Sequence, residues 1–147
     1  SNGVFTVYSD AGIPPGSQML VWQGGTAYFN GDYTGITPPE GTKCFMTTGT
    51  SYQGWGVFLS TNMSAYSNGY LKFWVRSSQQ LKVDLEGPQG TKRTVYTAST
   101  TNTWREFSLP ISSFSGVNLS QMYGLFEVTA QSPGTFYIDN VRWSKTP

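Results

Sequence analysis

The sequence contains no histidine, and charged residues occupy only 12% of its 147 positions. Histidine is the side chain that most readily exchanges protons near neutral pH, so the commonest group in acid–base catalysis is missing. The formal net charge of +1 creates no broad field that would attract a polyanion. Nucleic acid is therefore not an expected partner.

Cysteine and long apolar stretches are scarce as well. Cys44 is the one cysteine, so we expect a buried free thiol without an internal disulfide. No stretch approaches the roughly twenty apolar residues of a membrane span, and the first residues lack the features of a signal peptide. Neutral polar residues dominate, as in many extracellular β-rich proteins. We expect a monomeric, secreted, extracellular module excised from a larger protein, with no membrane partner.

Aromatic rings and short strand-like patterns are abundant instead. Aromatic residues make up 16% of the chain, which favours a surface that holds a ligand over one that transforms it. No apolar stripe with helical spacing persists for three turns, so the pattern predicts an all-β fold. The expected strands cover residues 4–9, 19–23, 42–48, 54–60, 70–76, 81–86, 93–98, 105–109, 124–129 and 135–143.

The number and spacing of these strands are typical of a β-sandwich jelly roll of two antiparallel sheets. We expect one domain over residues 1–147, in which residues 42–147 form the jelly-roll core. Successive strands switch sheets except at one hairpin. One sheet would hold residues 42–48, 70–76, 105–109 and 135–143, and the other would hold residues 54–60, 81–86, 93–98 and 124–129.

Residues 1–41 are expected to form an irregular N-terminal segment. Its Gly- and Pro-rich part, residues 10–40, should be a flap with one strand inside it. Tyr28, Phe29 and Tyr33 lie in this flap, where they either offer a second aromatic platform or plug the edge of the sandwich. We favour the plug.

Charged residues alternate with apolar residues along the strand at 81–86. Because side chains alternate between the two faces of a strand, Lys82, Asp84 and Glu86 share one outer face. This outer face is therefore expected to be polar.

The strand that ends at Thr129 extends the polar face. Inward Phe126 and Val128 would leave Leu125 and Glu127 outside. Glu127 would then lie near the charged row of the strand at 81–86.

The strand at residues 54–60 has an ambiguous phase. Either Trp55 packs inward with Val57, or Phe58 packs inward with the glycines. We expect Trp55 to face outward, since the glycines beside it would leave inward space for core side chains of the opposite sheet. Tyr96 is expected to face outward too. The candidate site residues on this outer face are Trp55, Lys82, Asp84, Glu86, Tyr96 and Glu127.

A simpler interpretation is that these charges form a solvated face with cross-strand pairing. Large aromatic residues in sandwiches usually pack, so three of the other four tryptophans are expected to be structural. These are Trp74, Trp104 and Trp143.

Five blocks of sequence, in order, resemble the galactose-binding-like jelly-roll carbohydrate-binding modules of polysaccharide-degrading enzymes. The blocks are residues 54–59, 63–75, 81–86, 104–110 with Phe114, and 137–141. Within that group the chain is most similar to modules of family 56, which accompany β-1,3-glucanases. The resemblance implies a non-catalytic module that binds β-1,3-glucan such as laminarin or curdlan and targets an attached glycoside hydrolase to polysaccharide. Aromatic platforms beside hydrogen-bonding groups suit pyranose rings.

The resemblance also raises the question of a metal. Asp10 and Asp139 resemble positions near which related modules often carry a structural calcium. Calcium takes about six to eight oxygen ligands, and two carboxylates do not supply them. No cofactor is expected, with a structural calcium as the alternative.

Other functions remain open at this stage. Asp84 with Glu86 or Glu127 could form the paired carboxylates of a small glycoside hydrolase or lyase. Other ligands would be cellulose, xyloglucan or xylan, and an adhesion sandwich without a sugar ligand is a further alternative. The short chain and the lack of a hydrolase signature favour a binding module.

Overall fold

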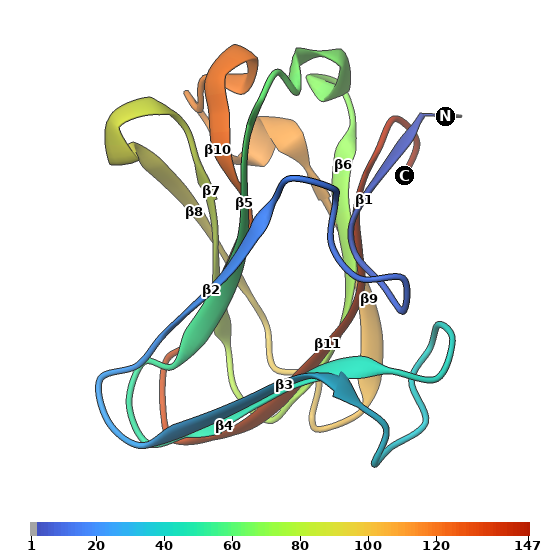
Figure 1. Cartoon of the computed structure of the whole chain (residues 1–147), viewed down its shortest axis with the longest axis vertical. Coiled ribbons are helices and arrows are strands. Elements are labelled where there is room, and N and C mark those ends of the chain that lie inside the picture. Colours follow the sequence, from blue (N-terminus) through green and yellow to red (C-terminus); the bar gives the residue numbers. More distant parts are fainter. Residues whose placement is uncertain (1–2) are drawn as a thin grey trace.

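Two antiparallel sheets enclose one apolar core in the computed structural model, which describes residues 3–147 (Figure 1). The first sheet, named the β11 sheet, contains in spatial order β3 (Ala27–Tyr33), β4 (Cys44–Gly49), β11 (Gly134–Ser144), β6 (Tyr70–Ser77) and β9 (Trp104–Pro110), and β1 (Val4–Tyr8) also pairs with β11. The second, named the β10 sheet, contains β2 (Gln18–Trp22), β5 (Gly54–Thr61), β10 (Met122–Ala130), β7 (Leu81–Glu86) and β8 (Lys92–Thr97). The expected β-sandwich, and the division of its eight later strands between two sheets, are confirmed.

Short helical turns join several strands. They are η1 (Ser64–Tyr66), η2 (Pro88–Gly90), η3 (Ile111–Ser113) and η4 (Leu119–Gln121). No helix within residues 3–147 is long and apolar enough to cross a membrane.

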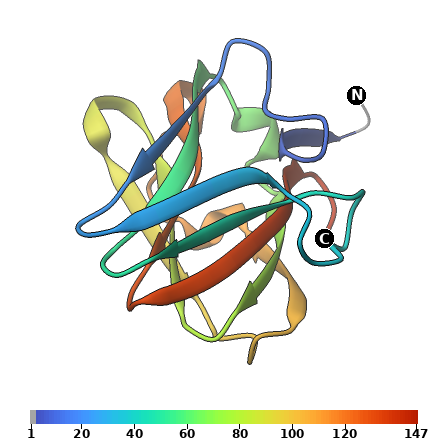
Figure 2. The same ribbon diagram turned by 60° about the horizontal axis from the view of Figure 1, so that its bottom comes forward.

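The N-terminal segment is more regular than the sequence indicated. Residues 10–40 contain two strands, β2 and β3, so the expectation of a single strand there is wrong. Figure 2 shows β3 beside β4 at the edge of the β11 sheet, and β2 pairs with β5 at the edge of the β10 sheet. A register shift between Asn30 and Tyr33 interrupts the alternation of β3, which hid this strand from pattern reasoning.

Two of the three aromatic residues of β3 contact other apolar groups. Phe29 packs against the core, and the rings of Tyr33 and Tyr137 lie 5.7 Å apart. Tyr28 remains 55% exposed. The plug interpretation therefore describes Phe29 and Tyr33 but not Tyr28.

The core follows the alternation of the strands. In β6, Leu71, Phe73 and Val75 are buried, whereas Trp74 between them is partly exposed on the outer face. Trp143 is fully buried, and its indole N–H donates to the Leu125 carbonyl at 2.9 Å. Burial of the Cys44 side chain confirms the free buried thiol.

Trp55 lies at the centre of the core, so its expected outward orientation is wrong. The residue is fully buried, and its indole stacks on Phe45 with ring centroids 4.1 Å apart and planes 9° apart. Tyr8 and Phe126 contact it at centroid distances of 5.7 and 5.3 Å. Its ring nitrogen has no hydrogen-bond partner in the described part of the chain.

The glycines beside Trp55 explain the reversed phase. They leave space on the outer face rather than the inner one. A Cβ at Gly54 would collide with the Trp22 indole, and a Cβ at Gly56 would lie 2.9 Å from a ring carbon of Phe58. The glycines therefore make room for outward rings, and Trp55 takes the inward position.

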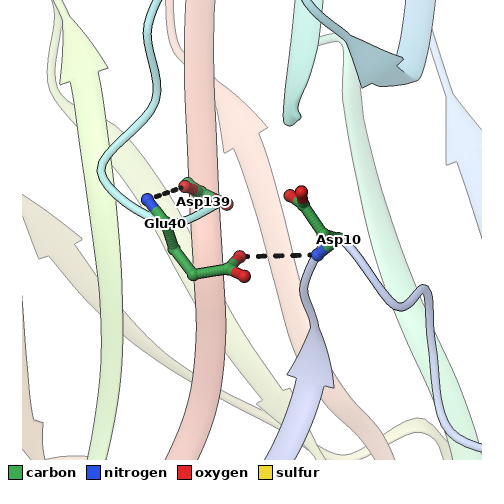
Figure 3. Close-up of side chains that lie close together, drawn as sticks. All are labelled: Asp10, Glu40 and Asp139. Carbon is green, nitrogen blue, oxygen red and sulfur yellow. Dashed lines mark hydrogen bonds between the residues drawn. The ribbon is translucent and has the colours of Figure 1, made fainter. Parts of the chain in front are cut away.

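Three carboxylates fasten the loop between β3 and β4 to β11 and to the turn after β1 (Figure 3). Asp139 accepts the backbone N–H of Glu40 at 2.9 Å, and Glu40 in turn accepts the N–H of Asp10 at 3.4 Å. Asp10 accepts the N–H groups of Thr42 and Lys43 at 2.7 and 3.1 Å. Each carboxylate thus accepts hydrogen bonds from backbone N–H groups that have no partner within a β-sheet.

Burial of Asp139 affects its ionisation. Desolvation, aided by the nearby Glu40 charge and opposed by the hydrogen bond from the Glu40 N–H, raises the pKa of Asp139 to about 6. The hydrogen bonds that Asp10 accepts, first that from the Thr42 N–H, lower the pKa of the Asp10 carboxyl. Asp139 and Asp10 therefore differ in proton affinity because burial dominates at Asp139, whereas accepted hydrogen bonds dominate at Asp10.

Replacing Trp55 by alanine should lower the free energy of unfolding by roughly 3–5 kcal/mol, because the lost indole leaves a cavity between the sheets. Urea unfolding monitored by circular dichroism measures this change. Tyr96→Ala is the matched control, since Tyr96 is 50% exposed and its loss should cost no more than about 0.5 kcal/mol. Equal stabilities for Trp55→Ala and wild type would contradict the core position.

The raised pKa of Asp139 predicts that folding stability depends on pH. An unfolded aspartate has a pKa near about 3.9, so between about pH 4 and 6 the folded chain holds a proton that the unfolded chain has lost. This contribution is complete below pH 4 and disappears as the pH rises through about 6, amounting to about 3 kcal/mol.

Asp139→Asn isolates the effect, because an amide does not ionise. With chelator present, urea unfolding gives the free energy of unfolding of each protein between pH 4 and 7, and the value for the wild type minus that for the variant should fall as the pH rises. A pH-independent difference would show that Asp139 ionises normally in the folded protein.

Candidate functional site

The registers of the β10 sheet place three rows of residues across its outer face, here named the β10 face. Each row runs from β2 through β5, β10 and β7 to β8. The first row is Trp22, Gly54, Thr129, Lys82 and Tyr96; the second is Leu20, Gly56, Glu127, Asp84 and Thr94; the third is Gln18, Phe58, Gly124, Glu86 and Lys92. The residues that alternate with them on β7 and β10 fill the core.

Glycines hollow out the middle of the β10 face. Gly54, Gly56 and Gly124 all lie on the central strands β5 and β10, one in each row. A Cβ at Gly124 would collide with the Glu127 carboxylate, as one at Gly54 would with Trp22. Side chains from neighbouring positions therefore lie across the glycines, close to the sheet, and bulkier groups stand at the edges.

Two hollows lie at opposite ends of this face. One, of about 360 Å³, is lined by residues that include Trp22, Tyr52, Lys82 and Tyr96. The other, of about 680 Å³, lies between Tyr123 and the turn that contains η2. The β10 face thus offers an elongated surface rather than one enclosed pocket.

An aromatic strip crosses β2, β5 and β10. The rings of Trp22 and Phe58 lie 6.4 Å apart, and those of Phe58 and Tyr123 lie 5.1 Å apart. The Trp22 indole N–H donates to the Thr129 hydroxyl at 3.0 Å, which fixes the ring over Gly54. Phe58 is almost covered, whereas Tyr123 keeps 38% of its surface exposed.

A charged strip runs beside the aromatic strip, on β10, β7 and β8. Lys82 Nζ lies 3.8 Å from Asp84 Oδ2, and Lys92 Nζ lies 3.2 Å from Glu127 Oε1. Thr94 also donates its hydroxyl to Asp84. The side chains of both carboxylates are buried, whereas those of both lysines are partly exposed.

Glu127 is the most perturbed acid of this strip. Burial and, next, contact with the Glu86 carboxyl raise the pKa of Glu127 to about 8, against the opposing charge of Lys92. A carboxyl with such a pKa is largely protonated at neutral pH and can donate a hydrogen bond.

Five of the six candidate residues share the β10 face as expected: Lys82, Asp84, Glu86, Tyr96 and Glu127. The sixth, Trp55, belongs to the core. Whether the five bind a ligand stays a prediction.

Sequence reasoning missed other residues of this face. Trp22 could have been found, because it alternates with Leu20 at the end of an expected strand. Tyr123 could not, since register shifts near Gly124 break the alternation of β10. The same irregularity buries Leu125, which was expected outside. The remaining missed residues are Tyr52, Phe58 and Lys92.

The carboxylate cluster on the other sheet is the place where a cation would fit. One oxygen from each of Asp10, Glu40 and Asp139 lies within 4.8 Å of the others. Carboxylate and backbone oxygens are the donors that calcium prefers. Glu40, which the sequence analysis did not select, supplies the third carboxylate. A structural calcium at this cluster remains a proposal, and Asp139 belongs to β11, not to the β10 face.

Comparison with solved structures shows the same fold in carbohydrate-binding modules. A family 11 module from a cellulosomal cellulase of Clostridium thermocellum has a TM-score of 0.70 at 14% identity, covering 100% of this chain and 98% of that one. A family 30 module from another cellulosomal cellulase of that organism has a TM-score of 0.71 at 14% identity, with 96% of each chain covered. A variant of the family 29 module CBM29-2 has a TM-score of 0.66 at 14% identity, covering 97% and 92%.

A search of curated proteins finds no match. A family model, however, matches residues 14–145, and its description is carbohydrate binding domain 30. The particular resemblance to family 56 is not supported, whereas the wider resemblance to jelly-roll carbohydrate-binding modules is confirmed. Because the match spans nearly the whole chain, the protein belongs to the carbohydrate-binding domain 30 family and is a non-catalytic carbohydrate-binding module.

Proposed function

We propose that the β10 face binds a chain of β-linked glucose units. The observation that carries this proposal is the parallel arrangement of an aromatic strip and a charged strip on one hollowed sheet. Pyranose rings have apolar C–H faces that stack on aromatic rings and a rim of hydroxyls that form hydrogen bonds. A sugar chain along this surface would meet both partners at once.

The exposed polar groups suit hydroxyl recognition. Lys82 and Lys92 donate hydrogen bonds only, and Glu86 accepts them. The buried carboxyl groups of Asp84 and Glu127 hold the two lysines in place, since Asp84 contacts the Lys82 ammonium and Glu127 contacts that of Lys92. A ligand would therefore meet donors and acceptors that are already oriented.

The comparisons support a glucan with 1,4-linkages. Structures of the family 11 module with a β-1,3-1,4-mixed-linked tetrasaccharide and of CBM29-2 variants with cellulohexaose and mannohexaose share the fold. Expectation of a pure β-1,3-glucan rested on the resemblance to family 56. We therefore propose mixed-linkage β-glucan and cello-oligosaccharides as the first ligands, ahead of laminarin and curdlan.

A module of this kind would act as a tether. Linked to a secreted glycoside hydrolase, it would raise the enzyme's local concentration at the polysaccharide and add avidity to the catalytic domain's own binding. The module itself would work as a monomer, since the proposed surface needs no second copy.

Isothermal titration calorimetry tests the ligand class. Cellohexaose, mixed-linkage β-glucan, laminarin, xylan and mannan should be titrated into the purified protein, with reducing ends measured after long incubation. Binding to the first two without new reducing ends is expected. Binding to none of the five would refute the proposed function, and binding to laminarin alone would restore the β-1,3 expectation.

Single substitutions test the surface. Tyr123→Ala and Tyr96→Ala should each weaken glucan binding at least tenfold, equivalent to about 1.4 kcal/mol, because each removes an exposed ring beside a hollow of the β10 face. Tyr28→Ala is the matched control, as this exposed tyrosine lies on β3 of the other sheet. Weaker binding by Tyr28→Ala with normal binding by the other two would move the site to the β11 sheet.

A further inference from the structure

Only one of the two oxygens of the Glu127 carboxyl group has an ion-pair or hydrogen-bond partner among the described residues. Oε1 pairs with Lys92 Nζ at 3.2 Å, whereas Oε2 has no hydrogen-bond partner in residues 3–147. The residue is 1% exposed, so water does not compensate. An unpaired carboxylate oxygen in such a place is costly, and a proton on it would remove much of the cost.

The neighbour that can share this proton is Glu86. Gly124 pairs with Glu86 across the sheet, and the space over this glycine is filled by Glu127 Oε2. The Glu86 side chain begins at the same spot, since its Cβ would lie 2.8 Å from a Cβ at Gly124. The side chains of Glu86 and Glu127 thus both pack over Gly124, and their carboxyl groups contact each other.

The other charged groups around Glu127 come from β7 and β8. Asp84 is its neighbour across the sheet on β7 and is paired with Lys82 and Thr94. From β8, Lys92 is the one cation paired with Glu127 in the described chain. The positions of β5 and β2 that share its row are Gly56 and Leu20, which carry no charge.

We propose that Glu86 and Glu127 share one proton and that glycan binding on the β10 face requires this proton, so that the module releases its ligand as the pair becomes fully ionised. The inference rests on the proposed function and adds its regulation. With the proton in place the pair offers one O–H donor beside a carboxylate acceptor. Without it, two like charges face each other across Gly124, and Lys92 must neutralise both.

Electrostatics support the direction of this effect. Burial, followed by contact with Glu86, raises the pKa of Glu127 to about 8. A bound sugar covers the pair further and removes water, which disfavours the ionised form still more. By linkage, if the ligand binds the protonated protein more tightly, the protein takes up a proton on binding at a pH near or above the pKa of Glu127.

The amino-acid composition makes this effect easy to recognise. The sequence has no histidine, and burial raises the pKa of the Cys44 thiol to about 12. A change in binding between pH 7 and 9.5 that disappears with Glu127 can therefore be assigned to the carboxyl pair.

The test measures affinity for cellohexaose or mixed-linkage β-glucan, whichever binds at pH 7, between pH 6 and 9.5. For the wild type we expect nearly constant affinity up to pH 7 and a loss of about thirtyfold by pH 9.5, the factor by which the protonated fraction falls when the pKa is about 8. Calorimetry at pH 8.5 in buffers of different ionisation enthalpy should show proton uptake on binding. Glu127→Gln, which mimics the protonated carboxyl, should remove both the loss and the uptake.

Glu106→Gln is the matched control, because Glu106 lies on β9 of the other sheet, paired with Arg142, and should leave the pH dependence unchanged. Thermal melting confirms that each variant is folded. Carbon-13 NMR of the unliganded protein follows the Glu127 carboxyl directly, and its midpoint should lie well above that of a solvated glutamate.

The outcomes separate the two hypotheses. Binding that is independent of pH, in a protein whose Glu127 is still protonated at pH 7, would overturn the coupling and leave the proposed function intact. A Glu127 that is ionised at pH 7 would overturn the shared proton. Absence of binding to every glycan at every pH would overturn both the proposed function and its regulation.

Discussion

The positions of Trp22, Phe58 and Glu127 on the β10 face depend on the missing side chains of Gly54, Gly56 and Gly124. Over the first two lie the rings of Trp22 and Phe58, and over the third lies the Glu127 carboxyl. Because outward space is filled in this way, the alternate residues of β5 must face the core. The absence of side chains at these glycines therefore determines both the aromatic strip on the outer face and the stacking of Trp55 on Phe45 in the core.

The face on which a side chain lies could be predicted only where apolar and polar residues alternate regularly along a strand. The charged residues of β7 follow a strict period of two, so Lys82, Asp84 and Glu86 were placed on the correct face from sequence alone. At Trp55, two opposite phases satisfy the same pattern, and only the packing of both sheets decides between them. The irregular part of β10 removed the signal altogether, which is why Tyr123 and Leu125 were misjudged.

Charge on the β10 face is organised so that acids lie beneath and bases lie above. Asp84 and Glu127 are nearly covered, while the lysines that pair with them reach solvent. Breaking a buried pair costs more than forming it gains, so such pairs chiefly hold side chains in defined places. In the proposed binding surface, this rigidity would matter more for fitting a stiff, uncharged polymer than net attraction would.

The N-terminal segment supplies an outer strand to each sheet, β2 beside β5 and β3 beside β4. Without it both neighbours would become open edges, whose unpaired N–H and C=O groups invite pairing between molecules and aggregation. The segment also carries Trp22, so it contributes a ring to the proposed binding surface as well as protecting the sheet edges. Any minimal domain designed from this protein therefore has to begin before β2, although the later strands alone complete the recognisable jelly-roll pattern.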